Sequence, residues 1–194
     1  MKKWKLSVSP SPHEWVICVT NNLDIFLNDH ASNERKASAN ALTLVAHYPD
    51  RKELVERMIE IAIEELNHFS QVMKILTSRN LTMNPDEKDP YVNRLRKKMN
   101  KNDSDQYLLD RLIVGAVIEA RGEERFRLLA ENLSGHALQP FYAGIAKSEA
   151  RHYQTFLALA AHYFEPEKVQ ENLDKWLEFE KELIASLPIR NRLH

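Results

Sequence analysis

The chain has 194 residues, enough for a domain with a substantial core, and only four of them are glycine. Its 27 Lys and Arg residues nearly balance its 28 Asp and Glu residues, so a net charge of −1 excludes a strong overall attraction to nucleic acid or membranes. The single cysteine, Cys18, excludes an internal disulfide bond and fits a reducing compartment.

Targeting segments are not expected in this sequence. No apolar run approaches the roughly 18 residues that a membrane-spanning helix needs. The first twelve residues contain lysines but lack the apolar segment of a secretory signal peptide. We therefore expect a cytoplasmic protein without a membrane partner, organised as one domain over residues 1–194.

Apolar residues recur at helical spacing along most of the chain, which predicts an all-α fold. In chain order, a short helix follows Pro12, and long helices are expected at about 22–47, 51–78, 105–133 and 138–163, with a last amphipathic helix at 166–186. Between residues 79 and 104 the periodicity weakens and two prolines interrupt it, which indicates a long crossover containing a short helix near 90–100. Gly135 is expected to end the third long helix. Two helical hairpins joined by a long crossover are typical of a ferritin-like four-helix bundle, here with extra N- and C-terminal helices.

A Glu-x-x-His sequence occurs in the second long helix, at Glu65 and His68, and again in the fourth, at Glu149 and His152. Residues three apart lie on the same face of a helix, so each pair offers a carboxylate and an imidazole side by side. About thirty residues before each pair, a further glutamate lies within an apolar stripe. These residues are Glu34 and Glu119.

Four glutamates in apolar stripes would be costly, because an unpaired buried charge costs several kcal/mol. Two divalent metal ions would balance four carboxylates, and two histidines would add one neutral ligand to each ion. A lone Glu-x-x-His is common on helices, but six such residues in matched halves indicate a di-metal site. Mixed carboxylate and imidazole ligands suit iron or manganese, although ligand type alone does not exclude zinc. The predicted ligands are Glu34, Glu65, His68, Glu119, Glu149 and His152.

Four neighbours of these residues are not predicted to be ligands. His30, one turn before Glu34, is expected to support a ligand or to be a core histidine. Glu123, one turn after Glu119, could be a supporting acid or a surface residue. Arg121 and Arg151, each two residues after a predicted ligand glutamate, are expected to form salt bridges.

Several segments resemble the tRNA-modifying monooxygenases that hydroxylate the isopentenyl side chain of 2-methylthio-isopentenyladenosine. The resemblance covers roughly residues 12–185. It is carried by Asn22-Leu23-Asp24, Asp29-His30-Ala31, Glu34-Arg35-Lys36-Ala37, Glu64-Glu65-Leu66-Asn67-His68-Phe69, Leu112-Ile113-Val114-Gly115-Ala116-Val117-Ile118-Glu119-Ala120-Arg121 and Ser148-Glu149-Ala150-Arg151-His152-Tyr153. It implies a non-haem enzyme with two iron ions held by the six residues above, and O2 as co-substrate. It also implies electrons from a reductase or ferredoxin system and a tRNA anticodon loop as partner, with no role for DNA.

A local basic surface would have to contact the tRNA, because the net charge is close to zero. The best candidate is the run Arg94, Arg96, Lys97, Lys98 and Lys101, with Arg190 and Arg192 in addition, although such a run is usually a solvated face. The alternative functions are a ferroxidase or another di-iron oxidase that acts on iron or a small molecule, and a helical bundle without enzymatic activity. The lack of a Cys-x-x-Cys pair argues against a rubrerythrin.

Overall fold

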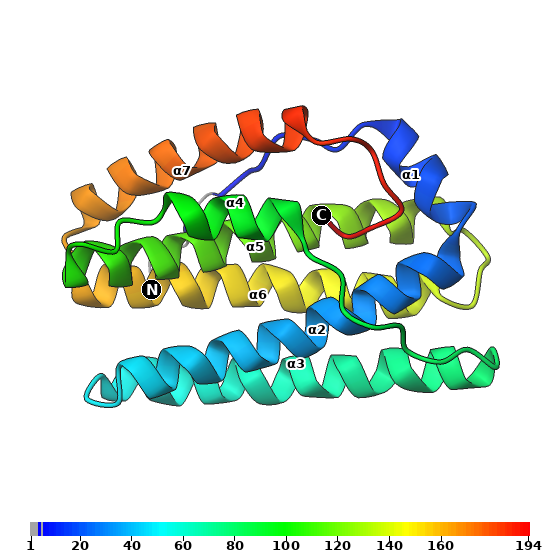
Figure 1. The fold of residues 1–194 in the computed structure, drawn as a ribbon, viewed down its shortest axis with the longest axis horizontal. Helices are drawn as coiled ribbons and strands as arrows, with labels where there is room; N and C mark the ends of the chain where they lie inside the picture. Colours follow the sequence, from blue (N-terminus) through cyan, green and yellow to red (C-terminus); the bar gives the residue numbers. More distant parts are fainter. Residues whose placement is uncertain (1–3, 5) are drawn as a thin grey trace. The chain divides into compact units, whose positions relative to one another are not determined.

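The computed structural model describes Trp4 and residues 6–194. Across this part of the chain it contains seven helices and no strand, so the all-α prediction is confirmed. The helices are α1 (His13–Thr20), α2 (Leu23–His47), α3 (Lys52–Ser78), α4 (Pro90–Lys98), α5 (Ser104–Asn132), α6 (Gln139–Tyr163) and α7 (Pro166–Ser186) (Figure 1). The ends of the five longest helices lie within one residue of the predicted ends.

The helices fall into two compact units, each described here by itself. One unit comprises residues 17–87 and 190–193 and contains the hairpin of α2 and α3. The other comprises the described residues up to 16 together with 88–189 and 194, and it contains α4 to α7.

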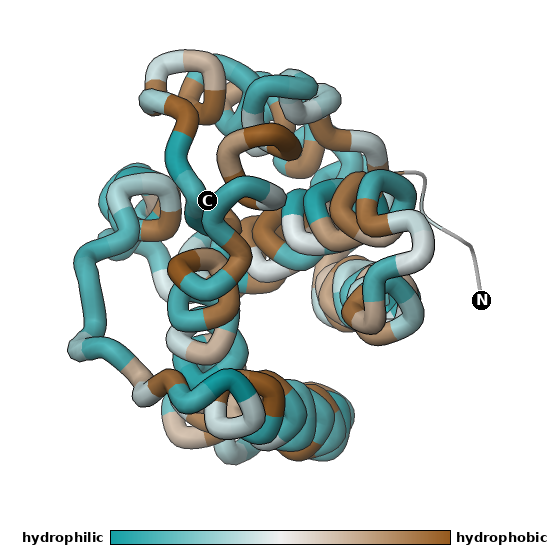
Figure 2. Tube along the Cα trace, turned by 90° about the vertical axis from the view of Figure 1, so that its right-hand side faces the viewer, coloured by the Kyte–Doolittle hydropathy of each residue, from teal (hydrophilic) through white to brown (hydrophobic). Residues whose placement is uncertain are grey.

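The α2–α3 hairpin is held by apolar side chains that recur every three or four residues along each helix. Hydrophobic and hydrophilic stretches accordingly alternate along the helical trace in Figure 2. The fully buried members of this stripe include Phe26, Leu27, Leu54, Met58 and Leu76.

The first part of the crossover is fastened to α2. The amide of Asn84 donates to Asn28 Oδ1 at 2.8 Å, and the Ser32 hydroxyl donates to Asp86 Oδ1 at 2.6 Å. The crossover therefore follows α2 through specific polar contacts, despite its weak apolar periodicity.

In the other unit α5 and α6 form a second hairpin, and α7 packs against α4, α5 and α6 (Figure 1). The two hairpin helices approach closely at Gly115, where a Cβ atom would lie 2.8 Å from Cε1 of Phe156. Gly135 lies between α5 and α6 with a φ of 74°, a conformation that glycine adopts without strain, as expected for a residue that ends a helix. Among the described residues, no helix is both long enough and apolar enough to cross a bilayer.

Candidate metal centre

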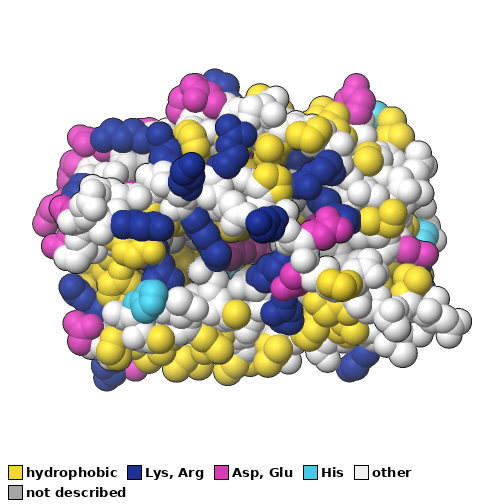
Figure 3. Space-filling model, viewed as in Figure 1, with side chains coloured by type: hydrophobic (Ala, Val, Ile, Leu, Met, Phe, Trp, Pro, Cys, Tyr) yellow, Lys and Arg dark blue, Asp and Glu magenta, His cyan; other side chains and the backbone are white. Residues whose placement is uncertain are grey.

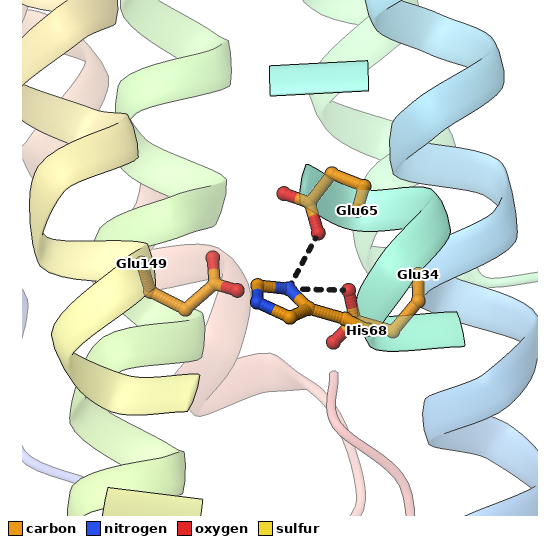
Figure 4. Close-up of side chains that lie close together, drawn as sticks. All are labelled: Glu34, Glu65, His68 and Glu149. Carbon is orange, nitrogen blue, oxygen red and sulfur yellow. Dashed lines mark hydrogen bonds and ion pairs between the residues drawn. The ribbon is translucent and has the colours of Figure 1, made fainter. Parts of the chain in front are cut away.

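The α2–α3 hairpin brings Glu34, Glu65 and His68 together. Glu65 and His68 lie on one face of α3 because they are three residues apart, and Glu34 reaches them from α2. All three side chains are buried, and each offers a ligand atom within 4.8 Å of the others. His68 Nδ1 lies 3.3 Å from Glu65 Oε2 and 3.5 Å from Glu34 Oε2 (Figure 4).

The two carboxylates and the imidazole of this first triad lie close enough to change one another's pKa. Burial raises the pKa of Glu34, but a hydrogen bond with Glu65, the charge of His30 and a hydrogen bond with His68 together hold it well below the usual range. Burial lowers the pKa of His68, but Glu34 and Glu65 raise it to about 10. The two carboxylates therefore attract positive charge to this position, which is the electrostatic requirement of a cation site.

The α5–α6 hairpin forms an equivalent second triad from Glu119, Glu149 and His152, whose ligand atoms also lie within 4.8 Å of one another. Glu149 and His152 are buried, whereas Glu119 keeps 12% of its side chain exposed. His152 Nδ1 lies 4.0 Å from Glu119 Oε2, a longer separation than those in the first triad.

Gly122 also lies beside the second triad, and the sequence pattern did not predict it. A Cβ atom there would lie 3.5 Å from Glu149 Oε2, so the missing side chain leaves room for that carboxylate against α5. The signal was its spacing, since Gly122 lies three residues after Glu119 on the same helical face.

His30 contacts a predicted ligand, whereas Glu123 does not. His30 is fully buried, and its Nε2 lies 2.5 Å from Glu34 Oε1, so it supports a predicted ligand. Glu123 belongs to neither triad and accepts a hydrogen bond from Arg127 Nε at 3.2 Å. Burial raises the pKa of Glu123.

The predicted basic run forms an exposed surface on α4 and just beyond its end. Figure 3 shows Lys and Arg side chains gathered on the face that carries α4. Two of the cations have intramolecular contacts with α7, since Arg94 donates to Ser186 at 3.0 Å and Lys98 Nζ lies 4.4 Å from the centre of the Phe179 ring. The exposed members are Arg94, Arg96, Lys97, Lys98 and Lys101.

Each triad has the donor set that iron or manganese prefers, with two carboxylates and one imidazole. Burial of these acids would be unfavourable without a compensating cation. The chemistry of the residues therefore fits metal binding, and the carboxylate and histidine clusters suit a di-iron site.

Comparisons with known proteins agree with this interpretation. A chain of Synechococcus described as "Protein 43 with aldehyde deformylating oxygenase activity" matches with a TM-score of 0.92 and 29% identity, over 98% of this chain and 96% of that one. This similarity confirms the ferritin-like fold class.

The tRNA 2-(methylsulfanyl)-N(6)-isopentenyladenosine(37) hydroxylase of Pseudomonas putida is 36% identical over 185 residues, which cover 95% of this chain and 89% of the relative. The enzyme of the same name from Salmonella typhimurium is 30% identical, over 95% of this chain and 86% of the relative. A family model described as tRNA-(MS[2]IO[6]A)-hydroxylase (MiaE) matches residues 2–194. The chain belongs to this MiaE family of tRNA hydroxylases.

Proposed function

We propose that this protein hydroxylates the isopentenyl side chain of 2-methylthio-isopentenyladenosine in tRNA, with dioxygen as the oxidant, at a centre of two iron ions. Membership of the MiaE family supports the reaction and the substrate. The observation that carries the metal assignment is the presence of two buried Glu-Glu-His triads in matched helical hairpins. The family also favours this reaction over the ferroxidase that the predicted ligands alone would allow.

The six triad residues would hold the two ions. His68 and His152 would each provide one neutral nitrogen ligand, and four glutamates would balance the four positive charges of two Fe(II) ions. Bound iron would supply the activation of dioxygen that C–H hydroxylation requires. The predicted ligands are Glu34, Glu65 and His68 from one hairpin and Glu119, Glu149 and His152 from the other.

The overall reaction needs an electron donor. One oxygen atom of O2 enters a C–H bond of the prenyl group, and the other leaves as water after two electrons and two protons are supplied. A separate reductase or ferredoxin system would provide the electrons, in the cytoplasm where tRNA is found.

The anticodon loop would contact the basic surface of α4. Lys and Arg side chains bind nucleic acid mainly through backbone phosphates, and these contacts orient the substrate without reading its sequence. The exposure of the five cations, Arg94, Arg96, Lys97, Lys98 and Lys101, supports this assignment. Arg192 is a weaker candidate, because it contacts Glu87 at 2.9 Å and Asp29 at 3.5 Å.

Nucleoside analysis of tRNA tests the proposed reaction. A host that lacks this gene should accumulate the isopentenyl nucleoside without its hydroxyl group, and the wild-type gene should restore hydroxylation. Glu65→Gln and Glu149→Gln should fail to restore it because each replaces a predicted ligand with a neutral amide. Glu123→Gln is the matched control and should restore it, since Glu123 contacts Arg127. An unchanged nucleoside profile in the host without the gene would show that the substrate assignment is wrong.

A further inference from the structure

The two helical hairpins are similar around the predicted ligands but differ one turn away from them. One turn before the first glutamate, the α2–α3 hairpin has His30 and the α5–α6 hairpin has Gly115. One turn after the histidine, the corresponding residues are Val72 and Phe156. The aromatic residue therefore comes before the ligands in the α2–α3 hairpin, as His30, and after them in the α5–α6 hairpin, as Phe156.

In the first hairpin, the carboxylate of Glu34 has two different neighbours. His30 Nε2 lies 2.5 Å from Oε1, and His68 Nδ1 lies 3.5 Å from Oε2. His30 is fully buried and comes from the same helix as Glu34, so the hydrogen bond has little freedom to rearrange. One carboxylate oxygen is therefore bound to His30, and the other is directed toward the rest of the triad.

In the second hairpin, the equivalent position cannot provide such a donor. Gly115 has no side chain, and the ring of Phe156 fills the adjacent space so closely that even a Cβ atom would lie 2.8 Å from it. Glu119 is also more exposed than Glu34, at 12% against 4%. Within the part of the chain that the structure describes, Glu119 has only the 4.0 Å contact with His152 and no neighbour equivalent to His30.

We propose that His30 is a positioning residue that holds Glu34 through Oε1 and leaves Oε2 for a metal ion, so that the first triad binds its ion more tightly than the second. The physical reason is pre-organisation, because a ligand already fixed in its binding orientation loses less freedom when the metal binds. This inference rests on the proposed two-metal centre. It adds that the first triad fills with metal before the second.

Titration of the metal-free protein with Co(II) under anaerobic conditions tests the proposal. Visible absorption reports the coordination of the ion, and calorimetry reports the affinity of each step. The wild-type protein should bind two equivalents in two resolved steps. His30→Leu should weaken the tighter step by roughly 10–100-fold, the usual effect of removing a group that orients a metal ligand, and should leave the weaker step unchanged.

Two further variants separate positioning from a general effect on packing. His30→Gln keeps an N–H donor and should recover much of the lost affinity. Ser38→Ala is the matched control, because Ser38 is buried one turn beyond Glu34 on the same helix and donates to the Ala62 carbonyl at 2.8 Å. This variant should bind both equivalents as the wild type does. Circular dichroism of the metal-free variants verifies their folding, and if His30→Leu unfolds, His30→Phe, which keeps a ring but has no N–H group, takes its place.

The possible outcomes distinguish this inference from the proposed function. Two steps of equal affinity in the wild type, or an unchanged tighter step in His30→Leu, would overturn the positioning role alone. A loss of affinity in Ser38→Ala as large as that in His30→Leu would also overturn it, because a change in packing and not the lost hydrogen bond would then be the cause. Fewer than two equivalents bound by the wild type would instead contradict the two-metal centre itself.

Discussion

Arg121 is a fully buried cation, and its contacts connect three parts of one compact unit. From α5 its Nε donates to Glu180 Oε1 of α7 at 2.8 Å, and its Nη1 donates to Glu124 at 3.0 Å and to the Ser9 carbonyl at 2.8 Å. Burial lowers the pKa of Arg121, but the charge of Glu180 helps to raise it above the usual value. The guanidinium therefore remains charged and holds α7 and the N-terminal segment against α5.

Removal of this cation should be strongly destabilising. Arg121→Met leaves Glu180 buried without its main partner, and we expect a loss of about 3–5 kcal/mol in the free energy of unfolding. The double variant with Glu180→Leu should recover most of that loss, because the buried Arg121–Glu180 pair is then absent and Glu124 keeps the hydrogen bonds from Ser11. Urea unfolding of the metal-free proteins measures both effects.

A surface variant is the control for this experiment. Arg127→Met removes a half-exposed side chain that pairs with Glu123 and Glu131, and such pairs contribute about 0–1 kcal/mol. If the double variant were as unstable as Arg121→Met, loss of packing rather than uncompensated charge would be the cause.

The sequence predicted part of this residue-scale detail. It predicted that Arg121 forms a salt bridge, which is confirmed. It did not identify Glu180 as the partner, because the two residues are far apart in the chain and only folding brings them together. Contacts within one helix were easier to predict: the sequence recognised Glu65 and His68 as a local pair and placed His30 one turn before Glu34 as a supporting or core histidine, and the structure shows that His30 contacts Glu34.

At the scale of an element, α4 depends on the residue that caps its start. Asp89 accepts hydrogen bonds from the amides of Tyr91 at 2.8 Å and Val92 at 3.2 Å, and His194 Nδ1 lies 3.0 Å away. Burial raises the pKa of Asp89, but His194 and the two amides outweigh it and lower the pKa to about 2. The ionised carboxylate therefore stabilises the folded state.

Asp89→Ala should lower the free energy of unfolding by about 1–2 kcal/mol at pH 7, since it removes the cap. The pKa of Asp89 is lower in the folded state than the usual value of 3.8, so its contribution is complete above that value and is lost as the pH falls toward about 2. Urea unfolding at pH 7 and pH 3 should therefore show a smaller difference between wild type and variant at the lower pH. Asp89→Asn keeps a capping oxygen and should be less destabilised at pH 7; equal losses at both pH values would contradict a role for the charge.

The helices themselves could be predicted closely, because apolar periodicity, prolines and Gly135 are local signals. The crossover was recognised by its prolines, but the residues that hold it were not. Asp86 contacts Ser32 and Asp89 contacts His194, and neither partner is near in sequence. Arg192 was predicted to face tRNA, yet it contacts acidic residues within the protein.

For the whole molecule, a net charge of −1 implies that tRNA affinity must come from a local surface. Each phosphate contact should contribute about 0.7–0.9 to the slope of log affinity against log salt concentration. We expect the triple variant Arg96→Gln, Lys97→Gln and Lys101→Gln to bind tRNA more weakly and with a smaller slope. These three positions leave the contacts of Arg94 and Lys98 with α7 intact.

The control must change the net charge equally at another place, because a loss of three positive charges alone weakens attraction to tRNA. Lys52→Gln, Lys74→Gln and Lys181→Gln together remove three exposed cations from α3 and α7. Binding measured at several salt concentrations should show that this control keeps a slope close to that of the wild type. Equal slopes for the two triple variants would mean that α4 is not the surface that contacts phosphate, whereas a reduced slope only in the α4 variant would locate the tRNA contact there.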